Sequence, residues 1–241
     1  MNRTLEINNL TKKYNNNRGI ENVSIEVNQG DIYGFLGPNG AGKTTAMKIM
    51  TGLLMPDSGD IKVFGYNLYE NYKKIMKNVG CLIENVDLYT YLTPYKNLKL
   101  AGRYYSINDT RIHEVLNITG IYKYKDEKVK NFSLGMKQRL GIAIAILHNP
   151  KLVILDEPLN GLDVEGMIDM RELIQKLSIE EKVTFFISSH LIHDVELTCN
   201  RIGLIYKGSL VNSDYTEEIL KSHSSLEKYF ISEVNYNNER N

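Results

Sequence analysis

Cysteine is scarce in this sequence, and its scarcity limits the chemistry that the chain can carry. The 241 residues include two cysteines, Cys81 and Cys199, which lie far apart and form no CxxC pair. Disulfide frameworks and cysteine-rich structural zinc sites need several cysteines at short, regular spacings. We therefore expect two reduced, mostly buried thiols in a cytosolic protein, with no disulfide and no metal role.

An excess of charge of one sign is also missing. Lysine and arginine together number 29, and aspartate and glutamate together number 29. A whole-molecule field that draws a protein onto nucleic acid or acidic lipid needs a net positive charge. No nucleic acid partner is therefore expected, while local charged patches stay open.

Long apolar runs and internal repeats are absent as well. No segment approaches the ~20 apolar residues that a membrane-spanning helix needs. The longest candidate, residues 142–155, is interrupted by His148, Asn149, Pro150 and Lys151. The first six residues contain no apolar signal segment. We therefore expect a soluble, cytoplasmic chain that is held at the inner face of a membrane only by another protein.

What the sequence does contain is an alternation of strand and helix patterns. Alternating apolar and polar residues predict half-buried strands at 5–7 and 23–27, and a more apolar strand is predicted at 31–36. A helix pattern begins at about Lys43. Residues 152–211 then repeat strand and helix twice and close with a hairpin.

Three helix starts interrupt this alternation. Thr93 before Pro94, Asp109 and Ser133 are each typical of a helix N-cap. We therefore predict a single α/β domain over residues 1–241, with a core at about 1–89 and 149–212, a helical insert at about 90–148 and a C-terminal extension at about 213–241. The polar last residues, 235–241, are expected to be disordered.

Residues 37–45 form a phosphate-binding motif between a predicted strand and a predicted helix. In the motif G-x-x-x-x-G-K-[ST], glycines turn backbone N–H groups toward one anion, the lysine bridges the outer phosphates and the hydroxyl binds Mg²⁺. Here the lysine is Lys43 and the hydroxyl belongs to Thr44. The nucleotide-binding residues that we predict from it are Gly37, Pro38, Asn39, Gly40, Ala41, Gly42, Lys43, Thr44 and Thr45.

A pair of acids, Asp156 and Glu157, ends the apolar strand predicted at 152–155. Acids at the end of a buried strand are costly unless they meet a cation or water at a site. We expect Asp156 to orient Mg²⁺ and Glu157 to polarise the attacking water in phosphoryl transfer.

Ser133 opens a further helix, followed by Leu134 and Gly135. A serine N-cap with free amides behind it makes a second anion site. One nucleotide needs one phosphate loop, so a second anion site calls for a second subunit.

The order of these parts, followed by Ser188, Ser189 and His190, resembles the ATP-binding cassette (ABC) family over residues 5–211. The resemblance implies an ATPase with an α/β P-loop NTPase core, an N-terminal antiparallel β subdomain and a helical insert. It implies ATP and Mg²⁺ as cofactors, a second cassette in a head-to-tail dimer, expected to be a homodimer, and a separate transmembrane permease.

The resemblance also assigns individual residues. Tyr14 matches the aromatic residue that stacks on adenine, although a core or loop tyrosine competes among 16 tyrosines. His190 matches the histidine that contacts the γ-phosphate. Ser133 and Gly135 match the residues that close on the partner's nucleotide, and Asp163 belongs to the loop that links the two composite sites.

The sequence departs from the family pattern at three places. Leu134 and Met136 replace a glycine and a glutamine in the serine-led motif, and Asn160 replaces a serine. Glu84 stands where most members have a glutamine, and we expect its carboxylate near Mg²⁺. The surroundings of Glu84 resemble the branch that exports, or confers immunity to, peptide antibiotics of the bacitracin and lantibiotic types.

Two other functions compete with a transport ATPase. A soluble switch acting on ribosomes or DNA shares the cassette, but two cassettes or a long coiled coil are typical of it. A GTPase or small-molecule kinase shares only the phosphate loop and leaves Ser133 and His190 unexplained. The sequence therefore favours an ATP-hydrolysing subunit of an ABC transporter, with export of a peptide antibiotic as its expected task.

Overall fold

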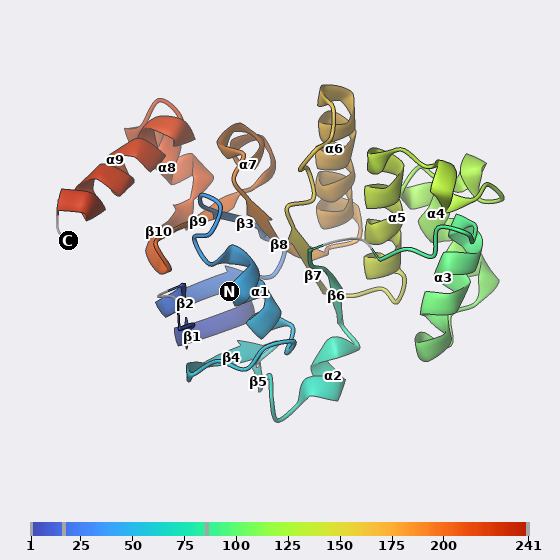
Figure 1. The fold of residues 1–241 in the computed structure, drawn as a ribbon, viewed down its shortest axis with the longest axis horizontal. Helices are drawn as coiled ribbons and strands as arrows, with labels where there is room; N and C mark the ends of the chain where they lie inside the picture. The colour runs from blue at the N-terminus through green and yellow to red at the C-terminus, as the bar shows by residue number, and fades with distance from the viewer. Residues whose placement is uncertain (1, 16–17, 85–86, 240–241) are drawn as a thin grey trace.

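Two β-sheets frame the computed structural model, which describes residues 2–15, 18–84 and 87–239 (Figure 1). The first is antiparallel, in the order β2-β1-β4-β5. Its strands are β1 (Arg3–Lys13), β2 (Gly19–Asn28), β4 (Ser58–Val63) and β5 (Tyr66–Asn67). The alternation that predicts strands at 5–7 and 23–27 is confirmed, because Leu5, Ile7, Val23, Ile25 and Val27 all point into the core.

The second sheet has six strands in the order β10-β9-β3-β8-β7-β6. All neighbouring pairs are parallel except β9 and β10, which form the predicted hairpin. The strands are β3 (Ile32–Leu36), β6 (Val79–Leu82), β7 (Leu152–Asp156), β8 (Thr184–Ser189), β9 (Arg201–Tyr206) and β10 (Ser209–Tyr215). Strands β3, β7 and β8 are buried along their whole length, as parallel strands covered on both faces are.

Helix α1 (Lys43–Met50) lies between the two sheets (Figure 1). Its residues Ala46, Met47, Ile49 and Met50 join a core cluster that contains side chains from both sheets. Burial of one large apolar side chain contributes about 1.5–3 kcal/mol. This packing holds α1, and the loop before it, against the ends of the parallel strands.

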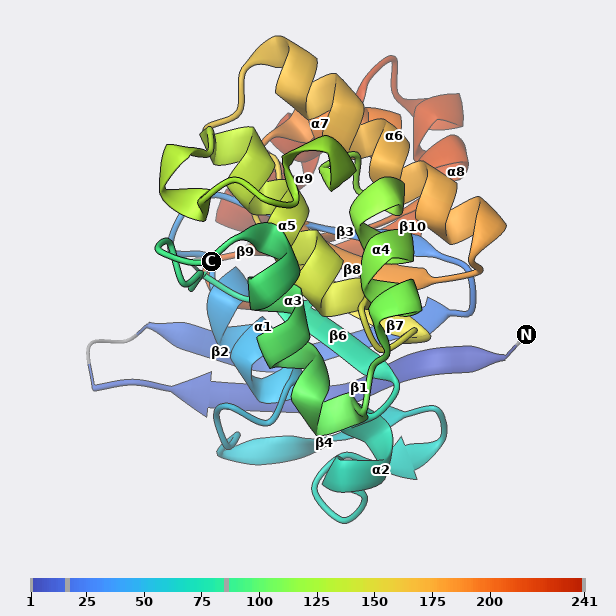
Figure 2. The ribbon, with the colours of Figure 1, turned by 90° about the vertical axis from the view of Figure 1, so that its right-hand side faces the viewer.

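The other face of the six-stranded sheet is covered by helices (Figure 2). Between β6 and β7 the chain forms α3 (Pro94–Gly102), α4 (Asp109–Ile118) and α5 (Leu134–Ile146), and after β7 it forms α6 (Val164–Glu180) and α7 (Ile192–Thr198). Short 3₁₀ helices at Arg103–Tyr105, Tyr122–Tyr124 and Val129–Asn131 complete the segment between β6 and β7, and helix α2 (Tyr72–Met76) precedes β6. The two sheets and these helices confirm the predicted α/β fold.

The predicted helix caps are confirmed at two positions and wrong at one. Thr93 accepts a hydrogen bond from the backbone N–H of Lys96, and Ser133 accepts one from that of Met136. The cap of α4 is Asn108, not Asp109, because the Asn108 side chain accepts from the N–H of Arg111 at 2.9 Å. Asp109 is the first residue of the helix, where its charge is favourable to the helix dipole.

The C-terminal segment corrects a second prediction. The sequence predicts disorder from Asn235 onward, whereas α8 (Thr216–Ser222) is followed by α9 (Leu226–Glu239). Buried Leu226 and Tyr229 anchor α9, so the core supplies the stability that its polar end lacks. Residues 240 and 241 lie outside the described part.

The two cysteines are unpaired, as predicted, but only Cys199 is buried. Burial raises the pKa of the Cys199 thiol to about 12, which keeps it protonated. Cys81 is exposed, contrary to the expectation of two buried thiols. In the described part of the chain, no helix is long and apolar enough to cross a membrane.

Candidate functional site

The chemical motifs meet at one edge of the parallel sheet. Strands β3, β8 and β7 are neighbours, and they end at Leu36, Ser189 and Asp156. In open α/β sheets, ligands bind outside the carboxyl ends of the strands. Residues 37–45, Glu157 and His190 each follow one of these ends directly.

The phosphate loop leads into α1 through Gly42, which has φ of 108°. A Cβ atom on Gly42 would lie 2.5 Å from Ile20 Cγ2 and 2.8 Å from the Gly19 carbonyl oxygen, so only glycine fits. Gly42 is also the N-cap of α1 and has no capping side chain. The N–H groups at the start of α1 are thus directed toward the loop, where an anion can accept from them.

Lys43 is folded back over the same loop. Its side chain is 6% exposed, and its Nζ atom donates to the carbonyl oxygens of Gly37 at 2.7 Å and Pro38 at 3.3 Å. Nζ also lies 3.2 Å from Oε1 of Glu157. A buried cation beside a helix start fits the outer phosphates of a nucleotide.

Glu157 is held between Lys43 and His190. Its Oε2 atom lies 2.9 Å from Nδ1 of His190 and accepts the backbone N–H of His190 at 3.3 Å. The backbone of Glu157 has φ of 49°, an uncommon conformation for a non-glycine residue that is frequent at functional sites. A carboxylate positioned in this way beside a phosphate loop can orient a water molecule.

Asp156 is buried and receives hydrogen bonds from two hydroxyl groups. Thr44 Oγ1 donates to Oδ2 at 3.0 Å, and Ser188 Oγ donates to Oδ1 at 2.5 Å. Ser188 Oγ also accepts the backbone N–H of Glu157 at 3.0 Å. From the sequence, Ser188 is identified only as part of the motif with Ser189 and His190. That position is the one sequence signal that could have indicated its bonds to Asp156 and Glu157.

A magnesium ion fits this arrangement. The described residues contain no group of three or more His, Cys, Asp or Glu side chains that could hold a metal alone. Mg²⁺ in nucleotide sites usually takes one or two protein ligands and completes its shell with phosphate oxygens and water. Thr44 and Asp156 are the residues that could hold it in this way.

Tyr14 lies with the phosphate loop although the chain separates them. A hollow of about 380 Å³ is lined by Tyr14 together with Asn39, Gly40, Gly42, Lys43, Thr44, Thr45 and Glu157. Tyr14 is 40% exposed, so its ring is available to a planar ligand. The structure therefore brings together the predicted adenine-stacking residue and most of the predicted phosphate-binding residues.

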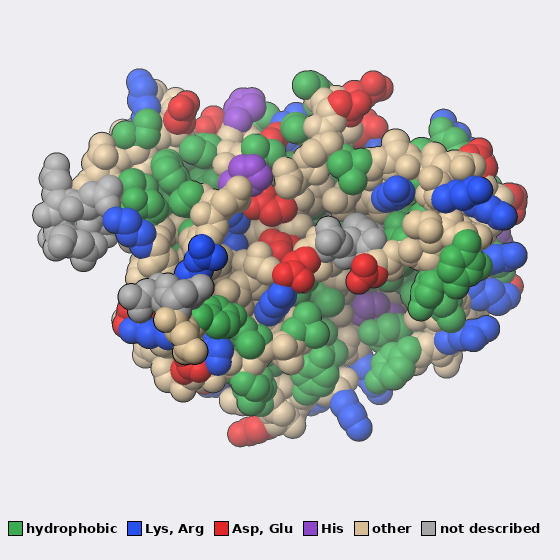
Figure 3. All heavy atoms as spheres, in the orientation of Figure 1, with side chains coloured by type: hydrophobic (Ala, Val, Ile, Leu, Met, Phe, Trp, Pro, Cys, Tyr) green, Lys and Arg blue, Asp and Glu red, His purple; other side chains and the backbone are tan. Residues whose placement is uncertain are grey.

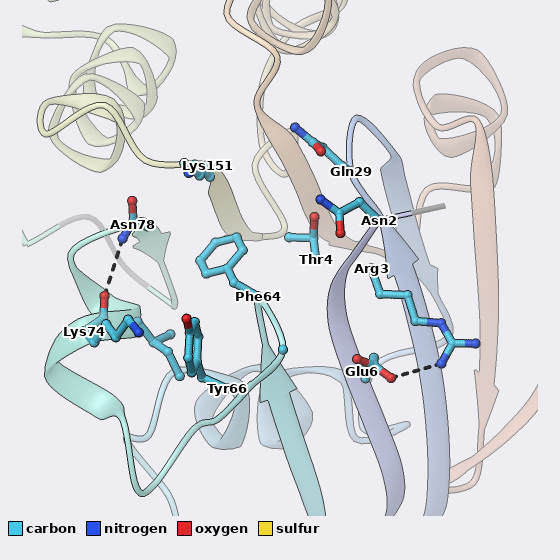
Figure 4. A pocket seen from close by; sticks show the side chains of 12 residues that line it. Asn2, Arg3, Thr4, Glu6, Gln29, Phe64, Tyr66, Lys74, Asn78 and Lys151 are labelled. Carbon is cyan, nitrogen blue, oxygen red and sulfur yellow. Dashed lines mark hydrogen bonds and ion pairs between the residues drawn. The ribbon is translucent and has the colours of Figure 1, made fainter.

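A larger hollow, of about 660 Å³, contains none of the motif residues (Figure 4). Asn78 and Lys151, which line it, directly precede β6 and β7, so it lies at the opposite end of the parallel strands. Lys74 covers the ring of Tyr66 there, 3.5 Å from its centroid. The smaller hollow is therefore the candidate site.

Four predicted site residues neither line the hollow nor belong to the phosphate loop or to the acids and histidine beside it. Glu84 pairs with Lys48, whose Nζ lies 2.6 Å from Oε1, one helical turn beyond Thr44 on α1. Its role as a metal-site residue stays a prediction. Ser133 and Gly135 lie at the start of α5, and Asp163 caps α6 by accepting the N–H of Gly166 at 2.9 Å.

Comparison with known proteins decides the family. The family model described as ABC transporter matches residues 20–160. The chain belongs to this family. It is similar to the bacitracin transport ATP-binding protein BcrA of Bacillus licheniformis, with 42% identity over 94% of this chain and 74% of that protein.

A second relative and a solved structure agree with this assignment. The lantibiotic transport ATP-binding protein SrtF of Streptococcus pyogenes is 40% identical over 93% of this chain and 99% of its own length. The structure of an ATP binding subunit of an ABC transporter superimposes with a TM-score of 0.82 at 26% identity, covering 96% of this chain and 99% of that one. The predicted fold and the prediction of an ATPase subunit of an ABC transporter are confirmed.

We expect Ser188→Ala to destabilise the fold by about 1–3 kcal/mol, because one oxygen of the buried Asp156 carboxylate and the N–H of Glu157 would lose their partner. Denaturant unfolding measures this change. The control is Ser178→Ala, since Ser178 makes one exposed bond, to the Gly30 carbonyl oxygen. Equal stabilities for the two variants would contradict the role given to Ser188.

Proposed function

We propose that this chain hydrolyses ATP with Mg²⁺ in a head-to-tail pair of cassettes and thereby drives a separate permease that exports a peptide antibiotic. One observation carries the proposal: Glu157 is held between Lys43 and His190 at the mouth of the phosphate loop. A water-orienting acid, a phosphate-binding cation and a histidine are the side chains that phosphoryl transfer to water requires.

Each residue has a distinct task in this proposal. Bound Mg-ATP would supply the phosphoryl group, and the positive groups of the site would neutralise the negative charge of its phosphates. Lys43 and the N–H groups of the loop bind the outer phosphates, and Tyr14 stacks on adenine, a contact typically worth ~1–3 kcal/mol. Glu157 orients the attacking water, and His190 holds the carboxylate in place and contacts the terminal phosphate.

A second cassette completes the site in this proposal. Ser133 and Gly135 form a helix start with an exposed serine, and they are not among the residues that line the hollow of their own chain. An anion-binding helix start that does not face its own nucleotide is available to a neighbour's. In this proposal Asp163 lies at the junction of the two copies, as the resemblance implies.

The permease would dock on a face that exposes large hydrophobic side chains. Figure 3 shows hydrophobic side chains on this face below its centre and over the helical region at its right. Large hydrophobic residues that are exposed in the described part of the chain include Leu53, Met55, Tyr72, Tyr89, Tyr91 and Tyr104. Exposed apolar patches mark interaction surfaces.

The tyrosines of residues 87–105 divide into two groups. Tyr95 packs against the core, and the ring of Tyr105 stacks on His148 at 4.2 Å, so these two are structural. Tyr89, Tyr91 and Tyr104 are 49%, 67% and 77% exposed and remain available to a partner. Residues 85 and 86 lie outside the described part.

The cargo is proposed from the relatives. Their names say that BcrA acts in bacitracin transport and SrtF in lantibiotic transport. Both ligands are peptide antibiotics, and the two relatives cover most of this chain. A cytoplasmic cassette at the inner face of the membrane, paired with its permease, would supply the energy for removing such a peptide.

Glu157→Gln tests the catalytic proposal. We expect hydrolysis to fall by ~10²–10⁴, the usual contribution of such a group, and an ATP-bound dimer to accumulate. Turnover and size-exclusion chromatography with Mg-ATP measure the two effects, with the exposed Glu227→Gln on α9 as the control. Turnover within about a factor of two of the unmodified chain would remove Glu157 from this role.

Ser133→Glu tests the pairing of two cassettes. The acid would repel the partner's phosphates, so turnover should collapse while ATP still binds the monomer with unchanged affinity. Ser225→Glu is the matched control, because Ser225 accepts the N–H of Lys228 at the start of another helix. Parallel loss of ATP affinity and turnover in Ser133→Glu would mean that Ser133 acts within its own chain.

Susceptibility to peptide antibiotics tests the cargo. Loss of the gene should lower the bacitracin or lantibiotic concentration that stops growth, and the unmodified gene should restore it. A gene encoding Glu157→Gln should not restore it. Unchanged susceptibility to both classes would exclude this cargo and leave the ATPase assignment intact.

A further inference from the structure

Leu134, at the start of α5, lies close to the loop that contains Gly161 and follows Glu157 in the chain. It stands where the common family form of the serine-led motif has glycine, and its side chain is 47% exposed. A Cβ atom built on Gly161 would lie only 2.9 Å from Leu134 Cδ2. The end of the leucine side chain therefore occupies the space beside Gly161 that a side chain at position 161 would need.

The next residue of α5, Gly135, also lies close to this loop. A Cβ atom built on Gly135 would lie 3.7 Å from Leu162 Cδ2, which is ordinary van der Waals distance. Leu162 itself is 7% exposed and belongs to the core. The start of α5 and residues 161–162 thus lie close together at two neighbouring positions within one chain.

The contacted loop is tied to Glu157. The Glu157 carbonyl oxygen accepts the N–H of Asn160 at 3.1 Å, and the Leu159 carbonyl accepts that of Leu162 at 3.3 Å. Gly161 has φ of 75°, the left-handed conformation that favours glycine. A displacement at Gly161 therefore reaches Glu157 through one short, hydrogen-bonded turn.

We propose that Leu134 is a positioning residue that couples the two nucleotide sites of the paired cassettes. The inference rests on the proposed head-to-tail pairing. In that pairing Ser133 contacts the partner's nucleotide, while Glu157 serves the nucleotide of its own chain. Leu134 joins these two elements inside one chain, so closure of the helix start on one nucleotide shifts the loop that sets Glu157 at the other.

The coupling is a property of the leucine side chain. Glycine at position 134 would have no atoms that reach Gly161, whereas leucine brings Cδ2 onto it. Leu134 is also the first residue of α5, so its replacement there disturbs little helical structure. A variant at this position therefore changes the contact and leaves the serine cap in place.

A double-mutant cycle between the two positions tests the contact. Gly161→Ala introduces both the left-handed strain and a clash with Leu134, so we expect turnover to fall about tenfold or more. In the background of Leu134→Ala the clash is gone and only the strain remains. The double variant should therefore turn over about fivefold faster than Gly161→Ala alone, a coupling at the lower end of those measured between sites.

The cooperativity of hydrolysis tests the coupling itself. The unmodified chain should show a Hill coefficient above one for ATP, and Leu134→Ala should lower it toward one while ATP affinity of the monomer stays unchanged. Leu134→Met keeps a side chain long enough to reach Gly161 and should restore cooperativity. A residue that only filled space would not produce this pattern.

Gly65→Ala is the matched control for the cycle. Gly65 has φ of 78°, close to that of Gly161, but a Cβ atom at Gly65 would have no described neighbour within 4 Å. Leu134→Ala should therefore leave the effect of Gly65→Ala unchanged.

Two failures can be told apart. If hydrolysis is cooperative but the effects of Leu134→Ala and Gly161→Ala are additive, the coupling is contradicted. The proposed pairing of cassettes is then unaffected. A different result would overturn the pairing, and the coupling with it. In that case turnover per chain would not change with protein concentration, and Ser133→Glu would not lower it.

Discussion

The buried carboxylate of Asp156 is the constraint on which the site depends. An isolated charge in this position would be strongly unfavourable, and two hydroxyl donors make it tolerable. Thr44 comes from α1 and Ser188 from β8, so the one carboxylate joins the phosphate loop to the strand that leads to His190. Ser188 then holds the backbone of Glu157 as well, which extends the same network to the second acid.

The arrangement around Glu157 follows from that network. With its N–H held by Ser188, the residue adopts φ of 49° and directs its carboxylate toward Lys43 and His190. The strained backbone is retained because partners on three sides determine it. Stability and chemistry therefore use the same hydrogen bonds at this edge of the sheet.

The parts of the site that consist of contiguous residues can be predicted from the sequence. The glycine spacing of residues 37–45 and the apolar strand before Asp156 are local patterns, and the structure places both at the strand ends. The Asn108 cap and the course of α9 to Glu239 depend on choices between neighbouring residues and on tertiary packing, and there the predictions from sequence are wrong.

Contacts between distant segments could not be derived in the same way. Only the family resemblance points to Tyr14, since nothing local distinguishes it among 16 tyrosines. The ion pair of Glu84 with Lys48 and the double role of Ser188 require the relative placement of α1, β6 and β8. Leu134 shows the limit most clearly, because the pattern marks it as a departure while only the packing reveals Gly161 beneath it.

The packing of Leu134 also bears on how a departure from a family pattern is tolerated. Glycine at this position has no side chain to approach the loop, whereas leucine places Cδ2 beside Gly161. The serine cap and the amides behind it are unaffected, because the bond from Met136 N–H to Ser133 is backbone to hydroxyl. Leucine at position 134 therefore preserves the groups that bind an anion. In the proposed coupling, it also makes the loop at residues 161–162 move with them.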